Sequence, residues 1–189
     1  MKVKLLGITP NADEFIGECA AVCYDADTSP EASVKRAVSC KDKGHLATMR
    51  FATATFEVSE ISRACSHQFV RSKHLDFLQE SQRYVDNSSH LEYYTPEAIK
   101  QDAKYLEYYD AAMTTAHRLY KYLRAQGVKK EDARYLLPNA VHTKLIVTGN
   151  FQAWGDFLKL RLDPAAQDEI RQVATTIKEI LHEQYPKLF

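Results

Sequence analysis

The sequence predicts an α+β protein that forms a single domain over residues 1–189. Segments with the alternating or β-branched pattern of strands are few, whereas stretches that repeat apolar residues every three to four positions are many. No repeat, low-complexity segment or linker interrupts the chain, and its length is sufficient for one sizeable core. Few strands among many helices, without a regular β-α alternation, indicate the α+β class.

The N-terminal part is predicted to begin with a short strand at residues 3–8. Asn11 is placed to cap the helix that follows. A second helix opens at Ser29 and ends at Gly44, and residues 52–58 alternate in the manner of a strand. The apolar face of the first helix is expected at Phe15, Ile16, Cys19, Ala20 and Cys23.

The middle of the chain changes character within one stretch. Residues 61–70 repeat apolar side chains at helical spacing, whereas residues 72–82 mix charged and amide side chains with few apolar ones. We therefore expect a helix followed by a loop lined with hydrogen-bond donors and cations. A second polar segment, 86–94, is predicted to be an exposed loop.

The remaining residues are predicted to be mostly helical. The longest helix is expected to start at Thr95 and to end at Gly127, with an apolar stripe along one face. It is followed by a short helix at 130–137, a strand at 140–148, and helices at 151–160 and 163–185.

Composition excludes several classes of partner. The chain has 25 basic and 25 acidic residues, so no global charge favours a nucleic acid polymer or an anionic membrane. No apolar run is long enough for a transmembrane helix, the first residues lack the apolar region of a signal peptide, and we expect a cytoplasmic protein. The four cysteines form no C-x-x-C pair and are expected to be reduced and mostly buried. His67, His74 and His142 have no ligand-like spacing with another histidine, a cysteine or a carboxylate, so no metal site is expected.

Several arginines and a lysine stand where an anion could bind. Arg71, Lys73 and Arg83 flank the polar segment and suit a phosphate or another oxyanion, although surface cations are usually only solvated. Arg134 and Arg161 lie within apolar runs, where each needs an anionic or carbonyl partner. An internal salt bridge would satisfy either of them equally well.

The same stretch carries a specific spacing of residues. Arg71-Ser72-Lys73 is followed, after seven residues, by Ser81-Gln82-Arg83-Tyr84, and S-R-A-C-S-H-Q precedes it. This arrangement resembles the signature of the flavin-dependent thymidylate synthases, which is R-H-R, seven residues, and then Ser-x-Arg-Tyr. Ser72 and Lys73 replace the second and third signature residues, so the chain resembles a divergent member. A-R-Y-L-L-P-N at 133–139 and F-L-K-L-R at 157–161 also match this family.

The resemblance implies roles on the nucleotide side of an active site. It implies that Arg83 binds the nucleotide phosphate and that Arg161 is the catalytic guanidinium, which stabilises negative charge developing on the uracil. Read from the residues alone, Gln79 and Ser81 are also compatible with loop capping, and Gln68 with a surface amide. The implied substrate-binding set is Gln68, Arg71, Gln79, Ser81, Gln82, Arg83, Arg134 and Arg161.

The resemblance also implies an FAD cofactor, with NADPH and methylenetetrahydrofolate as co-substrates. Most departures from the family pattern fall on this cofactor side, whereas the nucleotide side is retained. His45 follows Gly44 as in the family, but it is equally compatible with an ordinary loop histidine. The implied cofactor-binding residues are His45, Arg71, Ser72, Lys73, Gln79, Asn150 and Asp156.

The function implied by the resemblance is reductive methylation of C5 of dUMP to give dTMP. The implied fold is a central antiparallel sheet flanked by helices, assembled as a homotetramer with active sites at subunit interfaces. Two alternatives stay open. One is methylation or hydroxymethylation of UMP or a related nucleotide in modified-nucleoside biosynthesis. The other is a nucleotide- or flavin-binding protein without turnover.

Overall fold

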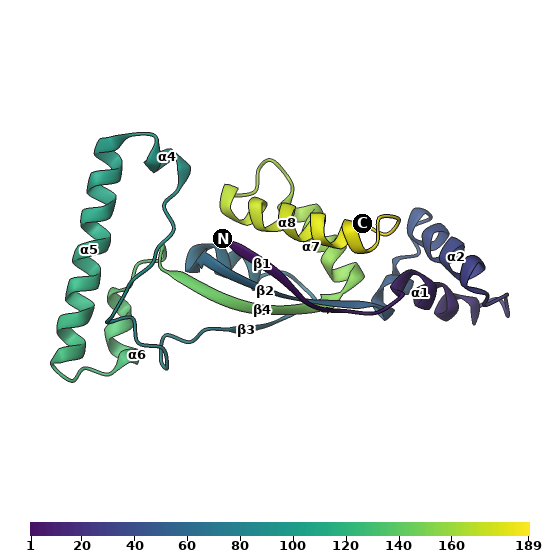
Figure 1. Ribbon diagram of the computed structural model, residues 1–189, viewed down its shortest axis with the longest axis horizontal. Coiled ribbons are helices and arrows are strands. Elements are labelled where there is room, and N and C mark those ends of the chain that lie inside the picture. Colours follow the sequence, from purple (N-terminus) through teal and green to yellow (C-terminus); the bar gives the residue numbers. More distant parts are fainter. The chain divides into compact units, whose positions relative to one another are not determined.

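The computed structural model describes residues 1–189 and contains one four-stranded sheet (Figure 1). The strand order is β1-β2-β4-β3. Neighbouring strands run in opposite directions. Between β2 and β4, for example, Ala52 before β2 bonds to Phe151 after β4, whereas Arg63 after β2 bonds to Val141 before β4. The strands are β1 (Lys2–Ile8), β2 (Thr53–Ser62), β3 (Leu75–Gln79) and β4 (His142–Asn150).

Helices account for most of the remaining regular structure. With the antiparallel sheet, they confirm the α+β class and the sheet flanked by helices. None of the helices combines the length and the apolar character that crossing a membrane requires. The α-helices are α1 (Ala12–Ala21), α2 (Pro30–Asp42), α3 (Arg63–Phe69), α4 (Glu97–Lys100), α5 (Ala103–Ala125), α6 (Lys130–Ala133), α7 (Phe151–Arg161) and α8 (Asp168–Gln184), and the 3₁₀ turns are η1 (Leu46–Phe51) and η2 (Arg134–Leu136).

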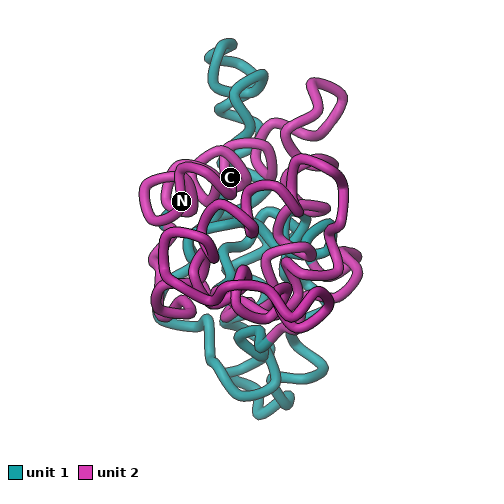
Figure 2. The backbone as a smooth tube through the Cα atoms, turned by 90° about the vertical axis from the view of Figure 1, so that its right-hand side faces the viewer, with its two compact units in different colours: residues 1–2, 58–69, 78–145 teal, residues 3–57, 70–77, 146–189 magenta.

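The chain forms two compact units, which Figure 2 colours separately. All four strands contribute residues to both of them. The single domain expected over 1–189 stays a prediction. Unit 1 comprises residues 1–2, 58–69 and 78–145, and unit 2 comprises residues 3–57, 70–77 and 146–189.

The core of unit 2 is built around Trp154, which is fully buried on α7. Its ring meets Phe56 edge-on at a centroid distance of 5.0 Å and Phe157 at 5.7 Å. The indole Nε1 donates a hydrogen bond of 3.0 Å to the backbone oxygen of Ala54, so the polar atom of this large side chain is satisfied. Asn150 starts α7 directly after β4, because its Oδ1 accepts from the backbone N–H of Ala153 at 2.9 Å.

Helices α1 and α2 approach each other closely at Gly17. A Cβ added there would lie 1.8 Å from the backbone oxygen of Ser33, so only glycine permits this packing. Of the predicted apolar face of α1, Ile16 and Ala20 are buried. The expectation was wrong for Phe15, Cys19 and Cys23, which are exposed or only half-buried, because the buried face is rotated toward Ala12, Gly17 and Ala21.

The loop predicted at 72–82 was wrong in part, because Leu75–Gln79 forms the edge strand β3. Leu75 is buried, whereas Leu78 is 74% exposed. An edge strand with a single buried face needs few apolar residues, so its polar composition concealed it. The sheet pairing extends past the strand, since the N–H of Glu80 donates to the oxygen of Lys144 at 2.9 Å.

Two predicted helices were wrong in part, one in its continuity and one in its start. The helix expected from Thr95 is divided into α4 and α5, because Asp102 caps a new helix by accepting from the N–H groups of Lys104 and Tyr105. The last helix begins at Asp168 and not near Asp163, whose carboxylate instead forms a turn by accepting from the N–H of Ala165.

The cysteines are all free, but the expectation that most are buried was wrong. Cys65 alone is buried, on α3, whereas Cys23 is exposed. Cys19 and Cys40 lie between these extremes, because the face of α1 and α2 that carries them is not the face packed against the core.

The loop after β3 is anchored to α5 through Asp86. Its Oδ1 accepts from the hydroxyl and the N–H of Ser88 at 2.5 and 2.9 Å, and its Oδ2 accepts from two nitrogens of Arg124 at 3.1 and 3.0 Å. The bonds from Ser88, followed by those from Arg124, lower the pKa of Asp86 from 3.8 to about 2. Asp86 therefore stabilises the fold above pH 3.8, and this contribution is lost as the pH falls toward 2.

We expect Asp86→Asn to lower the free energy of unfolding by at most about 1 kcal/mol near neutral pH, because the group is partly open to solvent. The difference between the variant and the parent should shrink as the pH falls from 4 to 2. Urea unfolding at a series of pH values measures this difference. A difference that stays constant down to pH 2 would contradict the role of the ionised carboxylate.

Candidate functional site

Arg83 lies on a tight turn that follows β3 in unit 1. The backbone oxygen of Ser81 accepts from the N–H groups of Tyr84 and Val85, each at 3.0 Å, which closes the turn. The guanidinium of Arg83 donates from Nε and Nη2 to one oxygen of Glu131, at 2.9 and 2.8 Å. This ion pair raises the pKa of Arg83. The predicted phosphate ligand is thus held by a carboxylate within the chain.

Arg134, a second predicted nucleotide contact, is also bound to Glu131. The Nε of Arg134 donates to the backbone oxygen of Glu131 at 3.2 Å. Nearby in sequence, Gln82 is nine-tenths buried and its Nε2 has no hydrogen-bond partner. Ser81 contributes its hydroxyl to the turn by accepting from the N–H of Arg83 at 3.3 Å. This part of unit 1 therefore contains the cations Arg83 and Arg134. It also contains the amide of Gln82, a buried donor without an acceptor.

Gln79, at the end of β3, is held by two hydroxyl groups. Its Nε2 donates to Ser66 on α3 at 2.9 Å and to Thr143 on β4 at 3.2 Å. These bonds fix the amide and leave its oxygen as the end that can accept a further hydrogen bond. Gln68 lies on the same helix as Ser66. Ser66 lies within the S-R-A-C-S-H-Q stretch, but the sequence did not indicate its contact with Gln79 or the contact of Thr143, because each joins separate segments of the chain.

Arg63, at the start of α3, is a residue that the sequence reasoning did not select. Burial lowers the pKa of its guanidinium, Arg134 lowers it further, and Glu80 partly opposes both effects. Arg63 and Arg134 are half-buried, and neither forms an ion pair with a carboxylate. A second cation thus lies near Arg134. Its only sequence signal was its position in S-R-A-C, directly after a strand.

The altered signature residues lie in unit 2. Arg71 and Lys73 are exposed and form no hydrogen bond or ion pair with the rest of the chain. The hydroxyl of Ser72 is buried and has no partner. Two unpaired cations and an orphaned hydroxyl are a donor set that suits the phosphates of a dinucleotide cofactor.

The predicted cofactor residues Asn150 and Asp156 line one depression of about 240 Å³ in unit 2. His74 and Arg50 lie on its wall, and the Nε of Arg50 donates to Gln152 at 2.6 Å. The side-chain oxygen of Asn150 already caps α7, so its role in this place is at least partly structural. The predicted residue His45 is exposed and does not line this depression.

Arg161 and Asp156 meet at a second depression, of about 510 Å³. Arg161 is the last residue of α7 and is half-buried, so the helix backbone fixes its position. Lys159 and Leu160 contribute to the same wall. The structure therefore brings the predicted catalytic arginine and one predicted cofactor residue together.

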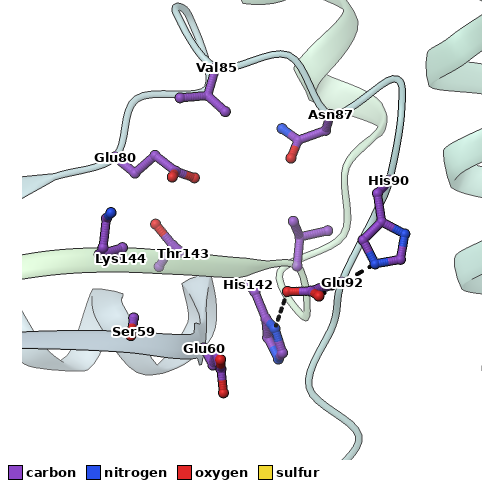
Figure 3. A pocket seen from close by; sticks show the side chains of 11 residues that line it. Ser59, Glu60, Glu80, Val85, Asn87, His90, Glu92, His142, Thr143 and Lys144 are labelled. Carbon is purple, nitrogen blue, oxygen red and sulfur yellow. Dashed lines mark ion pairs between the residues drawn. The ribbon is translucent and has the colours of Figure 1, made fainter. Parts of the chain in front are cut away.

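A third depression, of about 380 Å³, contains none of the predicted residues (Figure 3). Glu92 lies between His90, whose Nε2 is 3.4 Å from one carboxylate oxygen, and His142, whose Nδ1 is 3.7 Å from the other. Glu60 and Glu80 add two further carboxylates. Lys144 is the one lysine or arginine of the lining, against three carboxylates, and this excess of negative charge disfavours a phosphate. The nucleotide is therefore not expected here.

Comparison with known proteins assigns the family. Residues 4–187 match the model of the family described as "Thymidylate synthase complementing protein". The chain belongs to this family. The match covers nearly all of the chain, including every residue of the predicted site. The signature spacing at Arg71 to Tyr84 therefore lies inside a match that extends through both units.

Curated proteins named flavin-dependent thymidylate synthase resemble the chain over most of its length. The protein from Pyrococcus furiosus is 35% identical over 95% of this chain and 78% of its own length. That from Pyrococcus abyssi is 40% identical over 72% of this chain and 57% of its own. That from Geobacter sulfurreducens is 33% identical over 100% of this chain and 85% of its own.

In this member of the Thymidylate synthase complementing protein family, the predicted site residues are divided unequally between the two units. Unit 1 contains most of the nucleotide set, namely Gln68, Gln79, Ser81, Gln82, Arg83 and Arg134. Unit 2 contains His45, Arg71, Ser72, Lys73, Asn150, Asp156 and Arg161. The departures from the family signature, Ser72 and Lys73, thus lie in unit 2.

Proposed function

We propose that this chain is an FAD-dependent thymidylate synthase that methylates C5 of dUMP to form dTMP. Methylenetetrahydrofolate is the proposed carbon donor and NADPH the proposed reductant. Family membership supports an enzyme of this type. The observation that carries the nucleotide half of the proposal is the meeting of Arg83 and Arg134 at Glu131. Gln82, the sequence neighbour of Arg83, adds a buried amide nitrogen that has no partner.

On the nucleotide side, the guanidinium of Arg83 is proposed to bind the phosphate. A planar guanidinium presents two parallel N–H groups to two phosphate oxygens, and the charge strengthens both bonds. The orphaned Nε2 of Gln82 is a further donor for the same ligand. Gln79, oriented by Ser66 and Thr143, presents its amide oxygen and is proposed to align the nucleotide.

On the cofactor side, Arg71, Ser72 and Lys73 fit an anionic dinucleotide. Arg71 and Lys73 have no carboxylate partner that would have to be displaced, and the hydroxyl of Ser72 has no partner at all. FAD, when bound, supplies the redox chemistry of the reaction. The replacement of signature residues by Ser72 and Lys73 keeps one cation and one small donor, so we propose that binding is retained in an altered form.

Arg161 is proposed to act on the uracil. Methylation at C5 requires that carbon to become electron-rich, which places negative charge on the carbonyl and nitrogen atoms of the ring. A guanidinium fixed at the end of α7 stabilises that charge without having to reorganise during the reaction.

Because the signature is altered, two alternative functions are also tested. A relative that modifies UMP or a related nucleotide would retain the same phosphate ligands, and a binding protein without turnover would retain both ligand sites. The visible spectrum of the purified chain, after addition of FAD and removal of the excess, tests the flavin-binding part of the proposal, whereas product formation separates an enzyme from a binding protein. A flavin spectrum that shifts when dUMP is added supports the proposal. A chain that retains no flavin contradicts it.

Assembly into a homotetramer, with active sites at subunit interfaces, is also proposed. Helix α5 exposes Tyr105, Tyr108, Leu119 and Tyr122 by 60, 65, 45 and 60%. Their spacing falls on the alternating three- and four-residue steps of a heptad, which form one stripe along a helix. An apolar stripe of this kind on a soluble chain marks an interaction surface.

We expect a mass of four times 21.6 kDa by light scattering at micromolar concentration. Tyr108→Glu combined with Leu119→Glu should lower that mass, because buried unpaired carboxylates destabilise an interface by several kcal/mol. Thr114→Glu, which alters an exposed residue of α5 outside the stripe, is the matched control. A monomeric parent chain would contradict the assembly, and an unchanged mass in the double variant would contradict the role of α5.

A further inference from the structure

A depression of about 320 Å³ in unit 1 is lined almost entirely by cations. Its wall consists of Arg83, Arg124, Lys129, Lys130 and Glu131. Four positive side chains thus surround a single carboxylate. Arg83 is the proposed phosphate ligand, but the sequence reasoning selected none of the other four residues.

The four cations differ in how they are held. Arg124 is neutralised by Asp86 and also donates to the backbone oxygen of Val128, so its charge is already engaged. Lys130 donates to the backbone oxygen of Tyr84 at 2.8 Å, which leaves its charge without a carboxylate partner.

Lys129 is exposed and forms no hydrogen bond or ion pair through its side chain. The guanidinium of Arg83 has one carboxylate partner, Glu131, and it also lies 6.0 Å from the centre of the Tyr84 ring. The depression therefore has two lysine charges without a counter-ion and one arginine charge that becomes available when Glu131 moves away.

We propose that Lys129 and Lys130 complete the phosphate site of Arg83, and that Glu131 competes with the phosphate for Arg83. This inference rests on the proposed function, because it takes the phosphate of a nucleotide as the ligand. Glu131 and Arg83 are 37% and 54% exposed, so solvent screens their attraction and the pair opens readily. A phosphate dianion carries more charge than a carboxylate and meets all three cations at once, so it displaces Glu131.

If Glu131 competes with the phosphate, removing the charge of Glu131 should increase the affinity for phosphate. Glu131→Gln keeps the size of the side chain but removes both the competing charge and its repulsion of the phosphate. We expect the affinity for dUMP and for inorganic phosphate to rise by about 3- to 10-fold. Lys129→Gln and Lys130→Gln should each lower the affinity by about 2- to 5-fold, and added salt should reduce these differences.

Isothermal titration of the full chain with inorganic phosphate and with dUMP measures these changes. Asp132→Asn is the matched control, because it removes the same charge from the next residue, whose exposed carboxylate forms no ion pair. A gain of affinity cannot arise from partial unfolding, so Glu131→Gln tests the inference even if a lysine variant is unstable. The inference requires Glu131→Gln to exceed Asp132→Asn by at least about threefold.

Equal effects of the two carboxylate variants, or weaker binding by Glu131→Gln, would overturn the inference. If Arg83→Ala nevertheless weakens binding of dUMP, the proposed phosphate ligand stands and only the roles of Glu131 and the lysines fail. If Arg83→Ala leaves dUMP binding unchanged, the nucleotide assignment itself fails, and the inference fails with it.

Discussion

Arg83→Ala should weaken the binding of dUMP by about 10- to 150-fold while changing flavin binding by less than about twofold. The loss corresponds to the about 1.5–3 kcal/mol that a charge-assisted hydrogen bond contributes. The selectivity follows from the assignment of Arg83 to the phosphate, whereas Arg71, Ser72 and Lys73 are assigned to the cofactor. The variant should fold normally, because its partner Glu131 is exposed enough to be solvated alone.

Titration of each ligand into the folded variant gives the two affinities. Arg118→Ala is a suitable control, since it removes an arginine from the exposed surface of α5 that forms no hydrogen bond or ion pair. Equal losses for dUMP and FAD would show that Arg83 supports the structure of both sites instead of binding the phosphate.

Arg161→Lys should slow methylation by at least tenfold without preventing nucleotide binding. Lysine keeps the positive charge but loses the planar fork, so it cannot match two acceptors on the edge of a pyrimidine. Loss of one preorganised donor typically lowers the rate by about 10²–10³, and the retained charge makes tenfold the lower bound. The melting temperature should remain near that of the parent, and dUMP should still bind.

Single-turnover kinetics separate this effect from unfolding. Arg171→Lys provides the comparison, because Arg171 forms a salt bridge of 2.8 Å with Asp168 and donates to the backbone of Pro164. A purely structural arginine should lose activity only in proportion to the unfolded fraction. Full methylation by folded Arg161→Lys protein would remove Arg161 from the reaction.

The elements that could be predicted from sequence are those whose signal is local. Strand β1, helix α7 and the end of α2 before Gly44 follow from alternation, helical spacing and a residue with φ of +75°. Strand β3 could not be predicted in this way, because an edge strand is specified by pairing with β4 and not by its own composition. The division between α4 and α5 depends on the cap at Asp102, a signal that was present but outweighed by the continuous helical pattern.

In the candidate site, the identity of several residues could be predicted from sequence, whereas their contacts could not. The spacing of Arg71 and Arg83 indicated which side chains to consider, and their family is confirmed. The pairing of Arg83 with Glu131 joins residues 48 positions apart, so no local pattern could predict it. The packing that buries Gln82 without a partner for its Nε2 was equally inaccessible, because burial depends on the tertiary fold.

Product analysis tests the central claim most directly. The purified chain is incubated with FAD, NADPH and methylenetetrahydrofolate, and with either dUMP or UMP, and the nucleotides are separated and identified by mass. We predict that dUMP is converted to dTMP and that UMP is converted more slowly or not at all. Methylated or hydroxymethylated product from UMP alone would contradict the proposed substrate. The absence of any C5-modified product from a chain that binds both flavin and dUMP would contradict the enzymatic function.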